Sequence, residues 1–184
     1  MALTEACLEH SVLDWLLRSL DYCGDADESE RSIKTLSVFI DLAVSTSGCT
    51  AMLERGVAEK LRCVLYLGQP DDIVEYALWA LGCIAKMNRD ITDSLIERGV
   101  FAHVIRFLAE VDADADADAH GFGSTGDAVQ NTLLWTVCSF TQVGLPYSQL
   151  APVVPLLARC LRRFSEHDSE HDSLHNALVD VRGV

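Results

Sequence analysis

The chain has 184 residues, of which 49% are hydrophobic and 23% are charged, a composition typical of one folded domain with its own core. Its net charge of −14 disfavours nucleic-acid binding, because an acidic surface repels phosphate backbones. No apolar run reaches the roughly eighteen residues of a membrane span, and the acidic N-terminus is unlike a signal peptide. Seven cysteines without a C-x-x-C pair favour reduced thiols in the cytoplasm or nucleus over a disulfide framework or a zinc site.

Taken in chain order, the apolar periodicity predicts only helices. The expected helices are 7–20, 28–45, 49–56, 57–67, 75–85, 91–99, 100–110, 131–141, 148–164 and the start of one at 172–181. Trp15 lies within the first apolar stripe and is expected to pack in the core. No alternating apolar and polar pattern of useful length indicates a strand.

Two of these helix pairs repeat. Glu-Arg-Gly-Val occurs at 54–57 and again at 97–100, an interval of 43 residues. A short helix precedes each copy and an apolar-periodic helix follows it. Gly56 and Gly99 therefore fall where one helix ends and the chain turns sharply, a place where glycine accepts a positive φ.

The third helix of the unit repeats as well. "EYALWALGCIA" aligns with "NTLLWTVCSFT" through Trp79 and Trp135, and "IKTLSVFIDLA" is a weaker copy with Ser37 in place of the tryptophan. The tryptophans are 56 residues apart, and the excess over 43 is explained by an acidic insert that begins "DADADADAH". Helical units of this period stack into a solenoid with a continuous core.

The expected architecture is thus a single all-α domain over 1–184. The clearest repeats are 48–86 and 88–143, with an acidic, glycine-containing loop insertion at 112–126 and a polar linker at 164–173.

A three-helix unit near 43 residues is typical of armadillo repeats. "VEYALWALGCIAKMNRDITDSLIERGVFAHVIRFL" and "LLWTVCSFTQVGLPYSQLAPVVPLLARCL" resemble consecutive units from the middle of importin-α, over roughly residues 31–184. The resemblance implies an armadillo-type right-handed α-solenoid of about three to four three-helix repeats. In that family the third helices line a concave groove, where tryptophans flank Lys or Arg stems and an asparagine one turn later pairs with the peptide backbone.

The resemblance assigns six groove residues here, two from each third helix: Ser37 and Asp41, Trp79 and Cys83, Trp135 and Ser139. Two of the three tryptophan positions are kept. None of the three asparagine positions is kept, and each lost two-point contact with a peptide would cost about 1–2 kcal/mol.

Other motifs give weaker signals. Alternating aspartates from Asp112 resemble the start of a calcium loop, but Ala117 and Gly123 stand where glycine and glutamate are needed. His167, His171 and His175 are spaced by four residues, which is compatible with a metal site on a helix but also with a polar duplication. No nucleophile with a base is recognisable, so neither an enzyme activity nor a cofactor or metal is expected.

The resemblance implies a protein that binds basic peptides, namely nuclear localisation signals, for import into the nucleus. Such a protein is expected in the cytoplasm and nucleus, with basic cargo as its partner and neither nucleic acid nor membrane. No basic importin-β-binding arm is expected in this chain, because its N-terminus is acidic. The alternative is a generic armadillo interaction scaffold that no longer recognises import signals.

Overall fold

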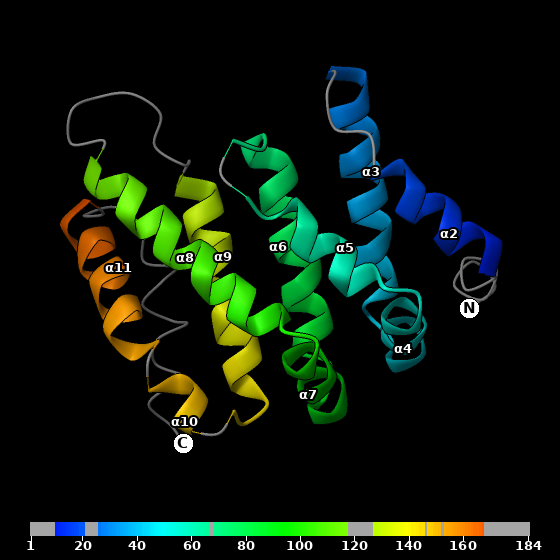
Figure 1. The fold of residues 1–184 in the computed structure, drawn as a ribbon. Helices are drawn as coiled ribbons and strands as arrows, with labels where there is room; N and C mark the ends of the chain where they lie inside the picture. The colour runs from blue at the N-terminus through cyan, green and yellow to red at the C-terminus, as the bar shows by residue number, and fades with distance from the viewer. Residues whose placement is uncertain are drawn as a thin grey trace. The chain divides into compact units, whose positions relative to one another are not determined.

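The computed structural model describes residues 10–20, 26–66, 68–117, 127–145, 147–151 and 153–167 (Figure 1). The chain divides into two compact units, residues 1–144 and 145–184. The described parts contain helices and turns but no strand, as the sequence predicts. None of their helices is long and apolar enough to cross a membrane.

The first unit holds eight described helices and the second holds two. They are α2 (His10–Ser19), α3 (Ala26–Leu42), α4 (Thr46–Glu54), α5 (Val57–Val64), α6 (Asp71–Ala85), α7 (Arg89–Glu97), α8 (Val100–Ala117) and α9 (Asp127–Gln142), then α10 (Tyr147–Leu150) and α11 (Val154–His167). In the first unit, α4 to α6 and α7 to α9 each form a short helix, a second helix and a longer third helix. The short α2 and the longer α3 precede them.

The turns within the two triplets obey the same rules. Gly56 and Gly99 have φ values of 77° and 73°, which confirms the expected left-handed turn before each second helix. Ser45 caps α4, and Asn88, 43 residues later, caps α7. Each side-chain oxygen accepts a 3.0 Å hydrogen bond from the backbone N–H three residues further along the chain, that of Gly48 or Ile91. Equivalent positions therefore start equivalent helices.

The core of the first unit lies around α6. Ten of its fifteen residues are buried, so α6 is a central helix with neighbours on more than one side. It packs against α3 and α9, and also against α5 and α7. A buried hydrogen bond joins two third helices directly: the Thr136 hydroxyl donates to the Leu78 carbonyl at 2.9 Å.

The structure differs from expectation at the acidic insert. α8 continues through Ala117, so the first six residues of the segment expected as a loop are helical. Alanine alternates with aspartate there, and alanine is the strongest helix former. The remainder of the insert, 118–126, lies outside the described residues. In the same way α11 extends to His167, inside the expected polar linker, while His171 and His175 lie outside the described residues.

Trp15 is also placed differently from expectation. Its side chain is 59% exposed, whereas Leu13, Leu16 and Leu20 are buried. Those three leucines form one stripe with helical spacing, and Trp15 lies off that stripe on the opposite side of α2. The apolar run is therefore wider than the buried face.

None of the five cysteines within the described residues forms a disulfide. Cys49, Cys83 and Cys160 are buried, as expected for structural thiols, but Cys63 is exposed. The Cys49 thiol donates a 3.6 Å hydrogen bond to the Ala43 carbonyl oxygen. Burial, with a smaller electrostatic contribution from Cys83, raises the pKa of Cys49 from 9.0 to about 11.

This shift predicts a loss of stability at alkaline pH. Above pH 9 the unfolded chain releases the Cys49 proton while the folded chain keeps it, so the free energy of unfolding falls until about pH 11. The expected fall from this thiol is about 2 kcal/mol. Urea titrations at pH 8, 9, 10 and 11 measure it, and Cys49→Ala is the control that should lack this component. Identical pH profiles for the two proteins would contradict the assignment.

Candidate binding surface on the third helices

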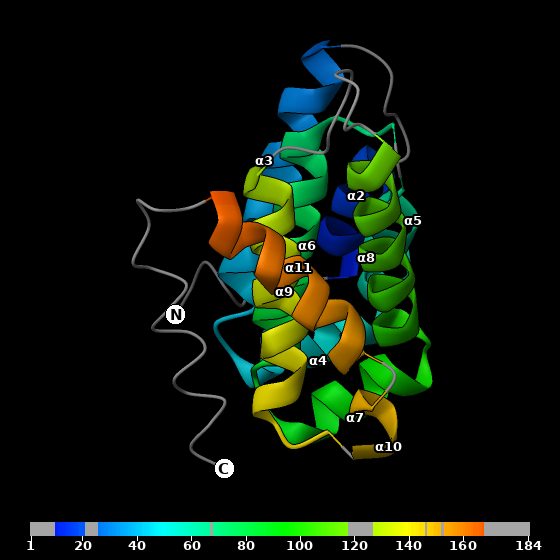
Figure 2. The same ribbon diagram turned by 90° about the vertical axis from the view of Figure 1, so that its left-hand side faces the viewer.

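The third helices α3, α6 and α9 lie side by side in the first unit, with α6 in the middle. Figure 2 shows them as one layer beside the layer of α2, α5 and α8. Ser37, Trp79 and Trp135 occupy equivalent positions of the three helices. We use the name third-helix face for the exposed or half-exposed side chains on this layer: Ser37, Asp41, Tyr76, Trp79, Lys86 and Trp135.

Trp79 is the most open aromatic side chain of this face, with 43% of its surface exposed. The Tyr76 ring lies beside it, with ring centroids 6.0 Å apart and the planes tilted by 48°. The two rings come from successive turns of α6. Together they present an aromatic surface on which the aliphatic stem and the charge of a Lys or Arg side chain can rest.

Trp135 has a different environment, because its ring packs against the backbone of the neighbouring helix. A Cβ atom added to Gly82 would overlap Cζ3 of the Trp135 ring and lie 2.9 Å from Cε3, so only glycine allows this approach of α9 to α6. The Lys86 ammonium lies over the same ring, 5.1 Å from its centroid. This distance is within the range of a cation–π interaction.

Two of the three positions that hold asparagine in importin-α, namely Cys83 and Ser139, are buried here. The Ser139 side chain is 1% exposed, and its hydroxyl donates to the Trp135 carbonyl at 3.0 Å. Cys83 is 8% exposed. Burial raises the pKa of the Cys83 thiol, although the Lys86 charge and a hydrogen bond with Trp79 act in the opposite direction. Both side chains therefore lie among packed helices rather than open on the third-helix face.

The third position in this set, Asp41, is exposed at the end of α3. Ser37, one turn before it, donates its hydroxyl to the Ile33 carbonyl at 2.9 Å and so turns back on its own helix. Of the six predicted groove residues, the structure thus leaves two tryptophans and one carboxylate with functional groups on the third-helix face.

The middle helix of this face is acidic. α6 contains Asp71, Asp72 and Glu75 and no Lys or Arg between Asp71 and Ala85. Asp71 and Asp72 are exposed, and Glu75 is partly exposed one turn before Trp79. A carboxylate next to an aromatic ring favours a cationic partner, because the ring face and the carboxylate attract the same charge.

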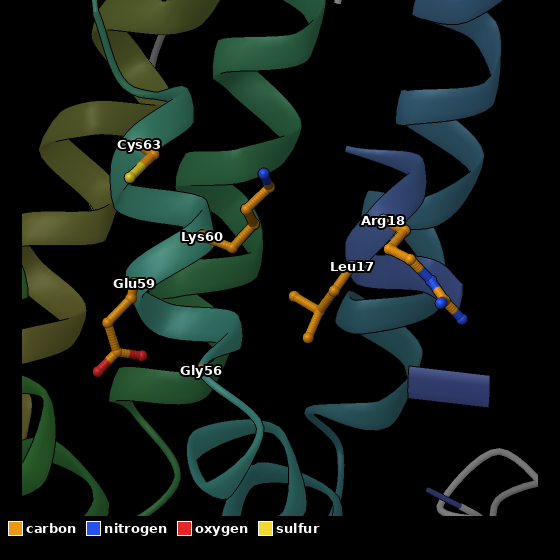
Figure 3. A pocket seen from close by; sticks show the side chains of 6 residues that line it. All are labelled: Leu17, Arg18, Gly56, Glu59, Lys60 and Cys63. Atoms are coloured by element: carbon orange, nitrogen blue, oxygen red, sulfur yellow. The ribbon is translucent and has the colours of Figure 1, made fainter. Parts of the chain in front are cut away.

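A second candidate surface is a cavity of about 340 Å³ on the second helices. It is lined by Leu17 and Arg18 of α2 and by Gly56, Glu59, Lys60 and Cys63 at and in α5. In Figure 3 Leu17 points toward α5 and Arg18 points away from it. Glu59 is already paired with Arg98 at 2.6 Å. The cavity contains none of the residues that the sequence predicts for binding.

No metal site is assembled in the described part of the chain, where no three His, Cys, Asp or Glu side chains are grouped for an ion. Asp112 is buried on α8, and the later residues of the calcium-like pattern lie largely outside the described side chains.

A structure search matches a designed armadillo repeat protein solved in complex with the peptide (KR)4, with a TM-score of 0.68 and 16% sequence identity. The fold is an armadillo-type α-solenoid. The match covers 95% of this chain and 64% of the designed protein, so this chain spans less than two thirds of that protein's length. No protein-family model matches the sequence, and no curated protein matches it.

Three residues that shape the third-helix face were missed by sequence reasoning: Tyr76, Gly82 and Lys86. Tyr76 could have been found, because it is one turn before Trp79 on the same helix. Gly82 carried a signal too, since a glycine inside an otherwise strong helix indicates a close approach of another element. Lys86 had no local signal, because its partner ring is 49 residues further along the chain.

Proposed function

We propose that the third-helix face binds an extended basic peptide, and that the chain serves as an importin-α-like receptor for nuclear localisation signals in the cytoplasm and nucleus. The observation that carries the proposal is the open Trp79 ring, 43% exposed, beside Tyr76 on an acidic helix of an armadillo fold. The designed armadillo protein of similar fold was solved with the basic peptide (KR)4.

In this proposal the peptide's Lys or Arg stem lies along the Trp79 ring, and its charge is balanced by carboxylates of α6 and α3. Glu75 lies one turn before Trp79 on the same helix, and Asp41 lies on the adjacent α3. Backbone contacts contribute less than in the resembling family, because Cys83 and Ser139 are buried. Recognition would therefore depend mainly on side chains and on charge.

Titration with the peptide (Lys-Arg)4 and with a lysine-rich import signal tests this proposal. The wild-type protein should bind with a dissociation constant below about 100 μM. Trp79→Ala should weaken binding by about tenfold, the value of one cation–π and apolar contact. Fluorescence anisotropy of a labelled peptide measures both affinities. Measurements at two salt concentrations separate the charge attraction, which salt screens, from the ring contact.

Trp15→Ala is the matched control, because Trp15 is a still more exposed tryptophan that lies on α2 rather than on a third helix. It should leave the affinity unchanged. An equal loss from both substitutions would contradict the assigned surface, and no binding near 100 μM would refute basic-peptide recognition.

The second candidate is an armadillo scaffold for partners other than import signals. The observation that favours it is the loss of an exposed amide at all three asparagine positions, where Asp41, Cys83 and Ser139 stand instead. A scaffold of this kind would bind neither basic peptide, and so the same titration distinguishes the two candidates.

A further inference from the structure

The position over the Trp135 ring is already occupied by a cation of the chain itself. The Lys86 ammonium lies 5.1 Å from the ring centroid, within cation–π range, and the ring's other environment is the backbone of α6 at Gly82. Trp79, by contrast, has an aromatic neighbour, Tyr76, and no basic residue in its own helix. The two tryptophans at equivalent repeat positions therefore differ in their availability to a partner.

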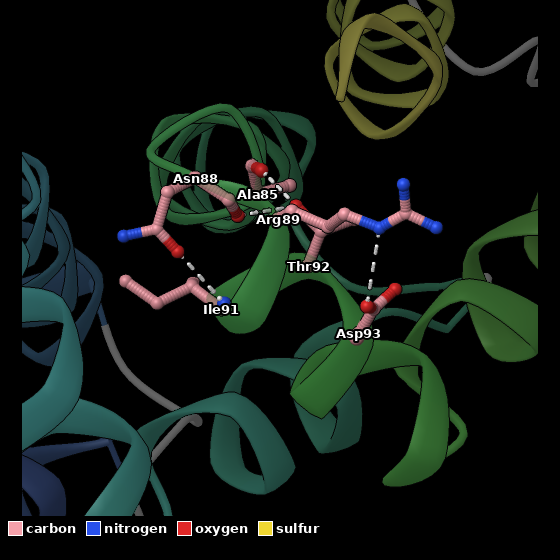
Figure 4. Close-up of polar contacts among 6 residues, drawn as sticks. All are labelled: Ala85, Asn88, Arg89, Ile91, Thr92 and Asp93. Atoms are coloured by element: carbon pink, nitrogen blue, oxygen red, sulfur yellow. Dashed lines mark hydrogen bonds and ion pairs between the residues drawn. The ribbon is translucent and has the colours of Figure 1, made fainter. Parts of the chain in front are cut away.

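The backbone fixes where the Lys86 side chain begins. Lys86 is the C-cap residue that directly follows α6, and its N–H donates to the Gly82 carbonyl at 3.1 Å. Two residues later, Asn88 caps α7, and the Thr92 hydroxyl lies within hydrogen-bonding distance of the Ala85 and Asn88 carbonyls (Figure 4). This network ties the end of α6 to the start of α7. The Lys86 side chain thus starts from a backbone segment that these hydrogen bonds hold in place, close to Trp135 of α9.

The neighbouring cation does not compete for the ring. Arg89 is the first residue of α7. Its Nε lies 3.6 Å from the Asp93 Oδ2, one turn further along the same helix, and Figure 4 draws this ion pair. Lys86 and Arg89 are both exposed and three residues apart, yet only Lys86 is over Trp135. Arg89 is therefore a matched control for the effect of charge alone.

From this geometry we infer that Lys86 fills the cation position over Trp135, so that the third-helix face holds one basic residue of a partner, at Trp79, and gains little from a second one at Trp135. This inference rests on the proposed peptide binding and specifies which of the two tryptophans receives a basic residue of the peptide. A second cation of the partner at Trp135 would have to displace the Lys86 ammonium or lie beside it. Both cost affinity, because the ring contact is lost or two like charges are brought together.

The test compares two probe peptides of eight residues, (Lys-Arg)4 and a Ser/Gly peptide with one central lysine. Lys86→Met keeps the length and apolar stem of the side chain but frees the Trp135 ring. It should tighten (Lys-Arg)4 binding by about fivefold and change single-lysine binding by less than twofold. Lys86→Arg, which keeps a cation over the ring, should behave like the wild type.

Arg89→Met makes the same change in net charge and should produce a smaller gain, one that disappears at 0.5 M salt because it acts only through screened charge. The gain of Lys86→Met should persist there. Trp135→Leu should cost (Lys-Arg)4 affinity in the Lys86→Met background and little in the wild type. Equal losses in both backgrounds would overturn the inference.

A measurement without any peptide tests the contact directly. The ring current of Trp135 should move the NMR signals of the Lys86 ε-methylene protons upfield, and Trp135→Leu should remove that shift. Unshifted protons in the wild type would overturn the inference. Binding of (Lys-Arg)4 by the wild type with no gain in Lys86→Met would overturn the selectivity alone. Absence of binding by both proteins would refute the proposed function, and the selectivity with it.

Discussion

Gly82→Val is expected to lower the free energy of unfolding by about 3 kcal/mol. A Cβ at this position would overlap Cζ3 of the Trp135 ring and lie 2.9 Å from Cε3, and valine adds two further carbons. Overpacking of this kind costs about 1–3 kcal/mol in ordinary cores. The upper end is expected here because the overlap falls on a rigid aromatic ring that already touches the α6 backbone. Urea denaturation followed by circular dichroism measures the change.

Gly82→Ala makes the result diagnostic. At an unconstrained helix position this change would stabilise the protein by about 1 kcal/mol, since alanine has the higher helix propensity. Here it should destabilise, by about 1–2 kcal/mol. Combining it with Trp135→Leu, which shortens the side chain that is in the way, should cost less than the sum of the two single changes. A stabilising Gly82→Ala would mean that the two helices are not in close contact at this point.

Features that depend on local periodicity could be predicted from the sequence. The interval of 43 residues aligns Gly56 with Gly99, and both have the expected positive φ. The same alignment places Trp79 and Trp135 at equivalent positions of adjacent third helices. These predictions succeed because the same sequence pattern occurs in two repeats, and each copy supports the structure predicted for the other.

Most features that depend on the surroundings of a side chain could not be predicted. Nothing in the run around Ser139 shows that its hydroxyl bonds to its own helix, and nothing around Lys86 indicates the Trp135 ring. The resemblance assigned Trp79 and Trp135 the same role, but their surroundings separate them. Sequence alignment finds equivalent positions, whereas availability to a partner is decided by neighbours that are distant in the chain.

The two wrong local expectations have physical causes. The apolar run along the sequence predicts a buried Trp15, but burial follows the stripe around the helix, and the buried stripe of leucines excludes Trp15. The start of the acidic insert was expected as a loop because of its charge. Its alanines nonetheless continue α8 to Ala117.

Phe140→Ala is expected to have the largest effect on stability, a loss of about 3–5 kcal/mol in the free energy of unfolding. The Phe140 side chain is fully buried in α9, and its ring lies 5.1 Å from the Phe101 ring of α8. Small domains are stable by about 5–15 kcal/mol, so this single truncation would remove a large part of the total. Urea titration again provides the measurement.

The same substitution should also reveal how cooperative the stack of repeats is. In a solenoid each repeat is stabilised by its nearest neighbours, so the loss at Phe140 should loosen α9 before α6. Single-tryptophan versions report this: the Trp135 fluorescence should change at a lower urea concentration than that of Trp79. Phe39→Ala, an equally buried phenylalanine in α3, is the matched control and should not advance the Trp135 transition relative to Trp79.

Coincident transitions in both variants would show instead that the first unit unfolds as one body. In that case a partner bound at Trp79 would stabilise the α9 surface as strongly as its own, because binding free energy is shared by every part of a cooperative unit.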